Sequence, residues 1–173
     1  MILIKSETIL MFSEIKFHFV LLPALILAFS CSSSGEQVVD ESAGQSEGFA
    51  DVTSVGVSGD EGDYTFRVEV SSPDTGCDQY ADWWEIVSEG GELIYRRVLL
   101  HSHVNEQPFT RSGGPVEIEA DTEVWVRAHM NNSGYGGEAF FGSPESGFEK
   151  IELDKEFAAD LENSEPLPDG CAF

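Results

Sequence analysis

Residues 66–70 read Phe66-Arg67-Val68-Glu69-Val70, and this stretch decides the fold class. Apolar and charged residues alternate one by one, which is the period of a β-strand that buries one of its two faces. The following residues, Ser-Ser-Pro-Asp-Thr-Gly at 71–76, favour turns and end the strand. The stretch therefore predicts a half-buried strand with one face in a core and the other in solvent.

Similar short segments recur along the chain with turn residues between them. Further strands are predicted around residues 52–57, 83–88, 92–101, 116–119, 123–130 and 138–142. The pair 83–88 and 92–101 forms a predicted hairpin across Glu89-Gly90-Gly91, and Ser-Gly-Gly-Pro at 112–115 is expected to be a turn. Short strands at regular spacing, without a long helix, indicate an all-β, immunoglobulin-like or fibronectin-III-like antiparallel sandwich of about 7–8 strands.

The sandwich domain is expected to cover residues 51–143, followed by a C-terminal extension at 144–173 that packs on the domain. The extension has a weak apolar pattern of Phe148, Ile151 and Leu153. Residues 154–163 suit a helical turn or two, and the prolines beyond them favour an extended chain.

The N-terminal residues have the pattern of an export signal. Lys16 precedes an apolar run at 17–29, which is too short to span a membrane as a helix and is followed by small and polar residues. Residues 1–30 are therefore predicted to be a signal peptide. A start at Met11 instead of Met1 gives a more ordinary signal, because the first ten residues carry both a lysine and a glutamate.

The end of the signal, Leu27-Ala28-Phe29-Ser30-Cys31, resembles the lipobox of bacterial lipoproteins. That resemblance implies a lipid on the Cys31 thiol, a flexible tether over 31–50 and a place in the cell envelope, with Ser32 pointing to the outer membrane of a two-membrane cell. Phe29 and Ala28 depart from the usual pattern. Cleavage by the ordinary signal peptidase, which would secrete the protein, is therefore the alternative.

The part of the chain after Cys31 is strongly acidic. It contains 30 Asp and Glu against seven Lys and Arg, and the whole chain has a net charge of −23. Such a surface repels phosphate backbones and argues against nucleic-acid binding. The acids are scattered, which is typical of a solubilising surface or of a protein in a salty medium. The mature length of about 140 residues suits one domain.

Two cysteines remain once Cys31 is assigned to the signal. Cys77 and Cys171 lie 94 residues apart, and we expect them to form a disulfide in an oxidising compartment. On the chain-entropy model such a crosslink contributes about 4–5 kcal/mol. Two free thiols are the alternative.

Three histidines form a candidate metal site. His101 and His103 are two residues apart, so both side chains would lie on one face of a strand, and His129 on a later strand offers a third ligand. Imidazole ligands suit copper or zinc. The alternative is that these histidines end a strand and bond to nearby loops.

An aromatic set offers a candidate binding surface. Trp83, Tyr95, Trp125 and Tyr135 would form a stacking surface for a protein or glycan partner if they face outward. Trp83 and Trp84 must point to opposite faces of their strand, so only one of them belongs to the core. In the alternative interpretation the C-terminal segment covers these aromatics.

The few arginines have two interpretations. Arg96, Arg97, Arg111 and Arg127 either form an anion site or offset neighbouring acids across the sheet. The sequence has no convincing catalytic constellation, because Ser102 lacks the strand–turn–helix setting of a nucleophile. We therefore expect a non-catalytic envelope lipoprotein without a cofactor, attached to the membrane through Cys31 and acting as a binding module. A copper or zinc protein that uses the three histidines is the alternative.

Overall fold

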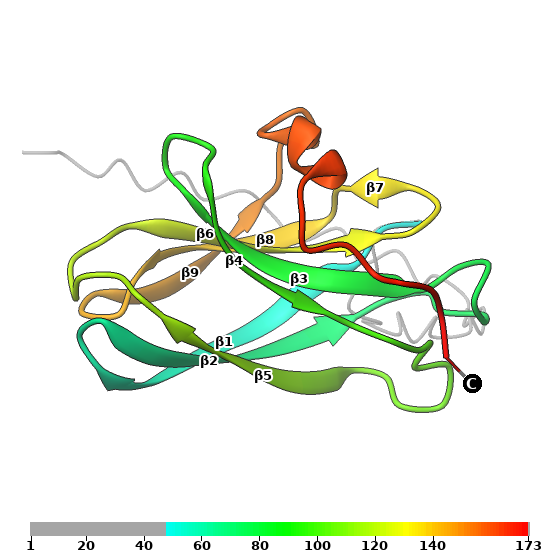
Figure 1. The fold of residues 1–173 in the computed structure, drawn as a ribbon, viewed down its shortest axis with the longest axis horizontal. Coiled ribbons are helices and arrows are strands. Elements are labelled where there is room, and N and C mark those ends of the chain that lie inside the picture. Colours follow the sequence, from blue (N-terminus) through cyan, green and yellow to red (C-terminus); the bar gives the residue numbers. More distant parts are fainter. Residues whose placement is uncertain (1–47, 173) are drawn as a thin grey trace, which may run out of the picture. The chain divides into compact units, whose positions relative to one another are not determined.

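A computed structural model describes residues 48–172, which form two antiparallel β-sheets packed face to face (Figure 1). The predicted signal peptide 1–30, the choice between Met1 and Met11, the lipidation site Cys31 and most of the tether 31–50 lie outside the described residues. The all-β sandwich that the alternating pattern predicts is confirmed.

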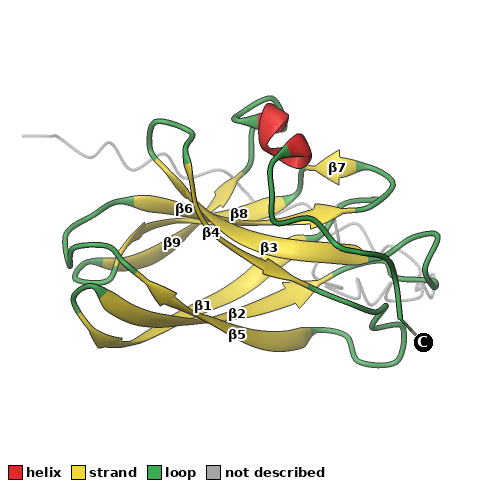
Figure 2. Ribbon diagram, viewed as in Figure 1, coloured by secondary structure: helices red, strands yellow, loops and turns green. Residues whose placement is uncertain are grey.

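The sandwich has a small and a large sheet, which Figure 2 shows as two layers. The small sheet contains, in spatial order, β1 (Asp51–Asp60), β2 (Asp63–Ser71) and β5 (Phe109–Val116). The large sheet contains, in spatial order, β4 (Leu93–Val98), β3 (Ala81–Ser88), β6 (Val124–Met130), β8 (Glu138–Ser143) and β9 (Gly147–Glu152). The short strand β7 (Gly134–Tyr135) pairs with β6.

The core lies between the sheets and follows the period of two. Phe66, Val68 and Val70 of β2 are fully buried, whereas the charged residues between them are not. Trp84 and Ile86 of β3 meet them from the large sheet. Burying each such side chain stabilises the fold by about 1.5–3 kcal/mol, so the alternation itself supplies most of the core.

A β-bulge explains why β1 departs from simple alternation. The pairing of β1 with β2 shifts register between Val52 and Ser54. The extra residue lets Val52 and Val55, which are three apart, both face the core.

The turn predicted at 112–115 is wrong, because these residues continue strand β5. Gly113 is needed for packing: a Cβ there would lie 2.6 Å from the Tyr95 hydroxyl and 2.9 Å from Cη2 of Trp84. Pro115 is tolerated because β5 is an edge strand of the small sheet. The glycine that suggested a turn is therefore required because two aromatic side chains of the large sheet pack against this position.

The described residues contain nine strands, against the predicted seven to eight. The additional ones are β7, in the glycine-rich loop after β6, and β9, which lies within the stretch assigned to the C-terminal extension and pairs with β8. The predicted helical turn is a 3-10 helix, η1 (Ala159–Asn163). Within residues 48–172, no helix is long and apolar enough to cross a membrane.

Candidate functional site

The outer face of the large sheet carries a polar layer instead of a solvent-exposed surface. Trp83 and Glu85 of β3 pair directly with His129 and Arg127 of β6, and these side chains point away from the core between the sheets. Arg96 of the neighbouring β4 is opposite Glu85. Trp83 lies on the face opposite Trp84, as strand alternation predicts. The burial of this face agrees with the alternative interpretation, in which the C-terminal segment covers the aromatics.

The C-terminal segment, residues 153–172, covers this face (Figure 1). Trp83 is 2% exposed and Tyr135 is 4% exposed. Trp125 is half-buried, with its ring 5.1 Å from that of Phe157. Tyr95 points the other way, into the core, where it contacts Trp84. The four aromatics therefore do not form an exposed stacking surface in this structure.

Glu85 lies between two buried arginines. Its side chain is fully buried, with Oε2 2.7 Å from Arg96 Nε and Oε1 2.8 Å from Arg127 Nε. Both guanidinium groups also lie against aromatic rings, Arg96 over Trp83 at 4.3 Å and Arg127 over Tyr135 at 3.6 Å. The carboxylate of Glu85 thus accepts hydrogen bonds from two guanidinium groups, and their remaining N–H groups need other acceptors.

Main-chain carbonyls of the C-terminal segment supply these acceptors. Arg96 donates to the carbonyl of Leu161 at 2.7 Å, and Arg127 donates to that of Ala158 at 3.0 Å. Further bonds from the two arginines reach the carbonyl oxygens of Phe157, Ser164 and Pro166. The two arginines therefore hold the segment on the sheet, and they are not available as an anion site.

The far end of the segment is held by the Cys77–Cys171 disulfide. Beside it, the backbone N–H of Ala172 donates to the carbonyl of Leu100 at 2.6 Å. The disulfide closes a stretch of 94 residues, as the pairing of the cysteines predicts.

His129 belongs to the covered face rather than to the other two histidines. Its Nδ1 lies 2.7 Å from Oδ1 of Asp82, and its ring stacks on Trp83 at 3.8 Å. Burial raises the pKa of Asp82, and the hydrogen bond to His129 opposes that shift. His129 also contacts the ring of Tyr135, at 4.7 Å. The predicted set of three histidines is therefore not assembled within the described residues.

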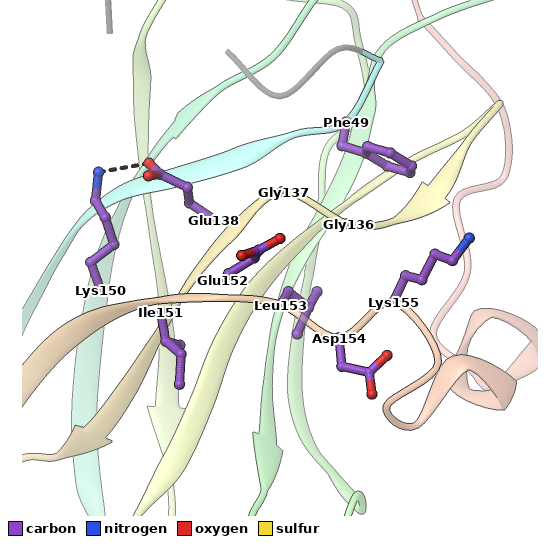
Figure 3. Close-up of a pocket in the computed structure, with 10 residues that line it drawn as sticks. All are labelled: Phe49, Gly136, Gly137, Glu138, Lys150, Ile151, Glu152, Leu153, Asp154 and Lys155. Atoms are coloured by element: carbon purple, nitrogen blue, oxygen red, sulfur yellow. Dashed lines mark hydrogen bonds and ion pairs between the residues drawn. The ribbon is translucent and has the colours of Figure 1, made fainter. Parts of the chain in front are cut away.

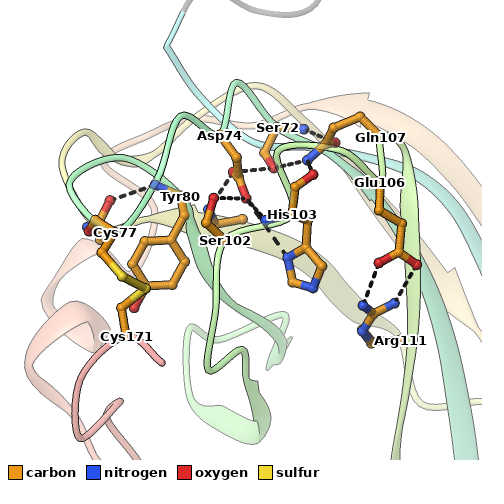
Figure 4. A network of polar contacts seen from close by, with 12 residues as sticks. Ser72, Asp74, Cys77, Tyr80, Ser102, His103, Glu106, Gln107, Arg111 and Cys171 are labelled. Atoms are coloured by element: carbon orange, nitrogen blue, oxygen red, sulfur yellow. Dashed lines mark hydrogen bonds and ion pairs between the residues drawn. A yellow bond between two sulfur atoms is a disulfide. The ribbon is translucent and has the colours of Figure 1, made fainter. Parts of the chain in front are cut away.

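His101 and His103 lie together after β4. Figure 4 shows His103 beside the buried carboxylate of Asp74. Asp74 accepts hydrogen bonds from Ser72 Oγ at 2.7 Å and from the backbone N–H groups of Ala81 and His103 at 3.0 and 2.7 Å. This carboxylate ties the loop after β2 to the loop that carries the histidines. It is a structural hub that no sequence motif indicates.

His103 is buried in an unusual way. Its ring stacks on Phe109 at 3.7 Å, and neither ring nitrogen has a hydrogen-bond partner. Burial, with the positive charge of Arg111 nearby, lowers the pKa of His103 to about 4. The imidazole is therefore neutral at neutral pH. Within residues 48–172, no group of three or more His, Cys, Asp or Glu side chains is arranged to hold a metal ion.

A groove of about 710 Å³ lies between β9 and the first described residues of the chain (Figure 3). Phe49 lies over Gly136 in its wall, where a Cβ on the glycine would be 2.5 Å from the ring. Ile151 is 40% exposed beside it. The groove thus offers exposed apolar surface next to polar side chains, which is a common composition of ligand sites.

Both lysines of the described chain line this groove. Lys150 pairs with Glu138 at 2.6 Å, whereas Lys155 has no ion pair within the part of the chain that the structure describes. Glu152 and Asp154 place carboxylates alongside. Sequence reasoning missed this site because Phe49 and Lys150 are far apart in the chain. The usable signal is that an acidic chain has its only two lysines after Lys16 within six residues.

Comparisons with known proteins give little coverage. No protein-family model matches the chain, and no solved structure matches it. A curated protein from Halomicrobium mukohataei, named "Putative lipoprotein", is 44% identical over 82 residues. The match covers 47% of this chain and 40% of that protein, so the chain spans less than half of the relative's length.

Proposed function

We propose that this chain is a lipid-anchored protein of the cell envelope and that its sandwich is a non-catalytic binding module. The lipobox-like sequence before Cys31 supports the anchor, as does the name of the relative from Halomicrobium mukohataei. By the same resemblance, Ser32 favours the outer membrane in a cell that has two.

The observation that carries the binding proposal is the groove beside β9. Its volume of about 710 Å³ is within the range of ligand pockets, about 300–1,000 Å³. Glu85, Arg96 and Arg127 of the covered face already have charged partners within the fold. The ammonium of Lys155, in contrast, has no ion pair within the described residues and is exposed at the groove. The groove is therefore a surface on which a charged side chain, Lys155, remains available to bind a ligand.

The composition of the groove favours an uncharged glycan. Phe49 provides a flat apolar contact for the C–H face of a sugar ring. The carboxylates of Glu152 and Asp154 accept hydrogen bonds from hydroxyl groups, and Lys155 donates to them. A polyanionic glycan is disfavoured, because the chain has a net charge of −23.

Binding is tested by NMR titration of the full chain in detergent with neutral hexasaccharides of glucose, mannose and N-acetylglucosamine. We expect saturable shifts at groove amides with at least one probe, and weakening of about tenfold in Lys155→Ala, the loss of one charged hydrogen bond. Glu92→Ala, at the exposed β3–β4 turn, is the matched control and should bind normally. Shifts confined to other surfaces, or none with any probe, would contradict the groove.

The anchor is tested separately by cell fractionation. Wild-type protein is expected in the membrane fraction, and Cys31→Ser is expected in the soluble fraction, because the thiol that carries the lipid is lost. An unchanged distribution would contradict lipidation at Cys31 without affecting the groove.

A further inference from the structure

The turn between β6 and β7 carries the only acceptor motif for N-linked glycans in the chain. It reads Asn131-Asn132-Ser133, which matches Asn-x-Ser/Thr with a residue other than proline in the middle. The other asparagines, at 105, 132 and 163, lack a serine or threonine two positions later. A motif this short also arises by chance, so its setting in the fold has to support it.

The motif lies where a modifying enzyme can reach it. Asn131, Asn132 and Ser133 are all exposed, in the turn that joins β6 to β7 at one end of the sandwich (Figure 1). Asparagines that carry glycans lie in surface loops, because the glycan is bulky and hydrophilic. The position of Asn131 in the fold therefore suits modification.

The side-chain amide of Asn131 can lose a hydrogen and keep its place in the fold. Its Oδ1 accepts a hydrogen bond from the backbone N–H of Tyr80 at 2.9 Å, and its Nδ2 donates to the carbonyl of Cys77 at 2.9 Å. The amide nitrogen has two hydrogens, and the second has no partner within the described residues. A sugar in place of that second hydrogen leaves both bonds intact.

Open space with polar walls lies next to the turn. A hollow of about 580 Å³ is lined by residues 131–134 and by Glu162 and Asn163 of the C-terminal segment. His129 lines it too, and its Nε2 makes no hydrogen bond within the part of the chain that the structure describes. Sugar hydroxyl groups can donate to such nitrogen and carboxylate acceptors. The first sugar on Asn131 therefore has both room and hydrogen-bond partners.

The disulfide supports the compartment that such a modification requires. Disulfides persist outside the reducing cytosol, and Cys77 and Cys171 form one in this fold. The export signal predicted over residues 1–30 agrees with this location. N-linked glycans belong to secreted proteins, so both features put the motif on the correct side of the membrane.

We propose that Asn131 carries an N-linked glycan, transferred from a polyprenyl-phosphate-linked oligosaccharide. Nδ2 forms a bond to the anomeric carbon of the donor's first sugar, while the bond from that carbon to the phosphate oxygen breaks. The polyprenyl phosphate leaves with the electron pair, and Nδ2 gives up one proton. Such a transfer needs export of the chain, which the proposed function also assumes, but neither the lipid on Cys31 nor the groove beside β9.

Mass spectrometry of the full chain, isolated from its native cells and cut with trypsin, tests the site. Trypsin cleaves after Arg127 and Lys150, so the peptide 128–150 contains Asn131 and Asn132 and no other asparagine. We expect this peptide to carry the added mass of an oligosaccharide, and electron-transfer fragmentation to locate it on Asn131. A peptide found only without added mass would overturn the proposal, and so would a glycan on Asn132.

Variants made in the same cells separate the motif from general surface reactivity. Asn131→Gln removes the acceptor and should abolish the modification. Ser133→Ala should abolish it although Asn131 remains, whereas Ser133→Thr should keep it, because either hydroxyl residue satisfies the motif. Asn132→Gln is the matched control and should stay modified. All three positions are exposed, and circular dichroism should show an unchanged fold. Modification that survives Ser133→Ala, or is lost in folded Ser133→Thr, would overturn the proposal.

Discussion

The two faces of strands β3 and β6 are both buried, but by different physics. On the inner face Trp84 and Ile86 pack into an apolar core against the small sheet. On the outer face, one residue along, Glu85 and Arg127 are equally inaccessible to water. The inner face is stabilised by removing apolar surface from water, and it tolerates exchange of one apolar side chain for another of similar volume. The outer face is stable only if every buried charge finds its acceptor.

The comparison shows that the C-terminal segment is a structural part of the sandwich. Its carbonyl oxygens satisfy Arg96 and Arg127, which a single carboxylate does not. Without the segment, two guanidinium groups and an aromatic layer would face solvent beside a strongly acidic surface. The outer face therefore requires both ends of the segment to stay in place, one held by the arginines and the other by the disulfide.

Removing the carboxylate of Glu85, which the two arginines share, should lower the stability of the fold more than any other change proposed here. Glu85→Ala leaves two buried cations facing each other and should lower the free energy of unfolding by about 3–5 kcal/mol. Urea unfolding measures this. On the inner face, Ile86→Val at the neighbouring position should cost only about 0.5–1.5 kcal/mol, because it removes one methylene.

The matched control removes the whole charge cluster. A triple variant, Glu85→Leu with Arg96→Met and Arg127→Met, leaves no unpaired buried charge and should be clearly more stable than Glu85→Ala. It should nevertheless release η1, because the carbonyls lose their donors, and proteolysis near residues 157–166 should become faster. A triple variant as unstable as Glu85→Ala would mean that the charges themselves stabilise the fold.

Loss of the disulfide should have the next largest effect and should act on one end only. Cys77→Ser is expected to lower the free energy of unfolding by about 2–5 kcal/mol, since the crosslink restricts the unfolded chain. Hydrogen exchange should speed up at the amide of Ala172, which donates to Leu100, and change little in η1, which the arginines hold. Equal deprotection of both ends would show that the segment docks as a single unit.

The smallest expected effect concerns alkaline pH. Burial, together with the negative charge of Glu85, raises the pKa of Tyr135 in the folded state. The unfolded value is about 10, so this group stabilises the fold fully below pH 10 and the contribution is lost as the pH rises above it. Melting temperatures between about pH 8 and 11 should fall more steeply in the wild type than in Tyr135→Phe. Parallel curves would argue against this role of Tyr135.

Local pattern predicted a good part of this structure. The strand at 66–70, the hairpin of β3 and β4, and the outward direction of Trp83 and Glu85 all follow from the period of two. The Cys77–Cys171 pair follows from counting cysteines. The prediction of a turn at 112–115 was wrong, because Gly113 is there to make room for the side chains of Tyr95 and Trp84, which are distant in sequence.

The candidate sites show the same difference between what local sequence predicts and what depends on contacts between distant residues. His101 and His103 are in contact, but in the loop after β4 and not on one face of a strand, which is where their spacing predicted them. The placement of His129 beside Asp82, and of Phe49 beside the strand that carries Lys150, depends on which strands pair and in what register. That information is spread over the whole chain.

The sequence by itself determined which residues alternate, where the signal-like and acidic segments lie, and which cysteines remain to pair. These are properties of neighbouring residues, and backbone geometry translates them directly into strands. Only the tertiary structure decided that Glu85 would be buried between two arginines and covered by a segment that bonds to Arg96 from some 70 positions further along the chain. Burial depends on what packs above a face, and no local pattern contains that information.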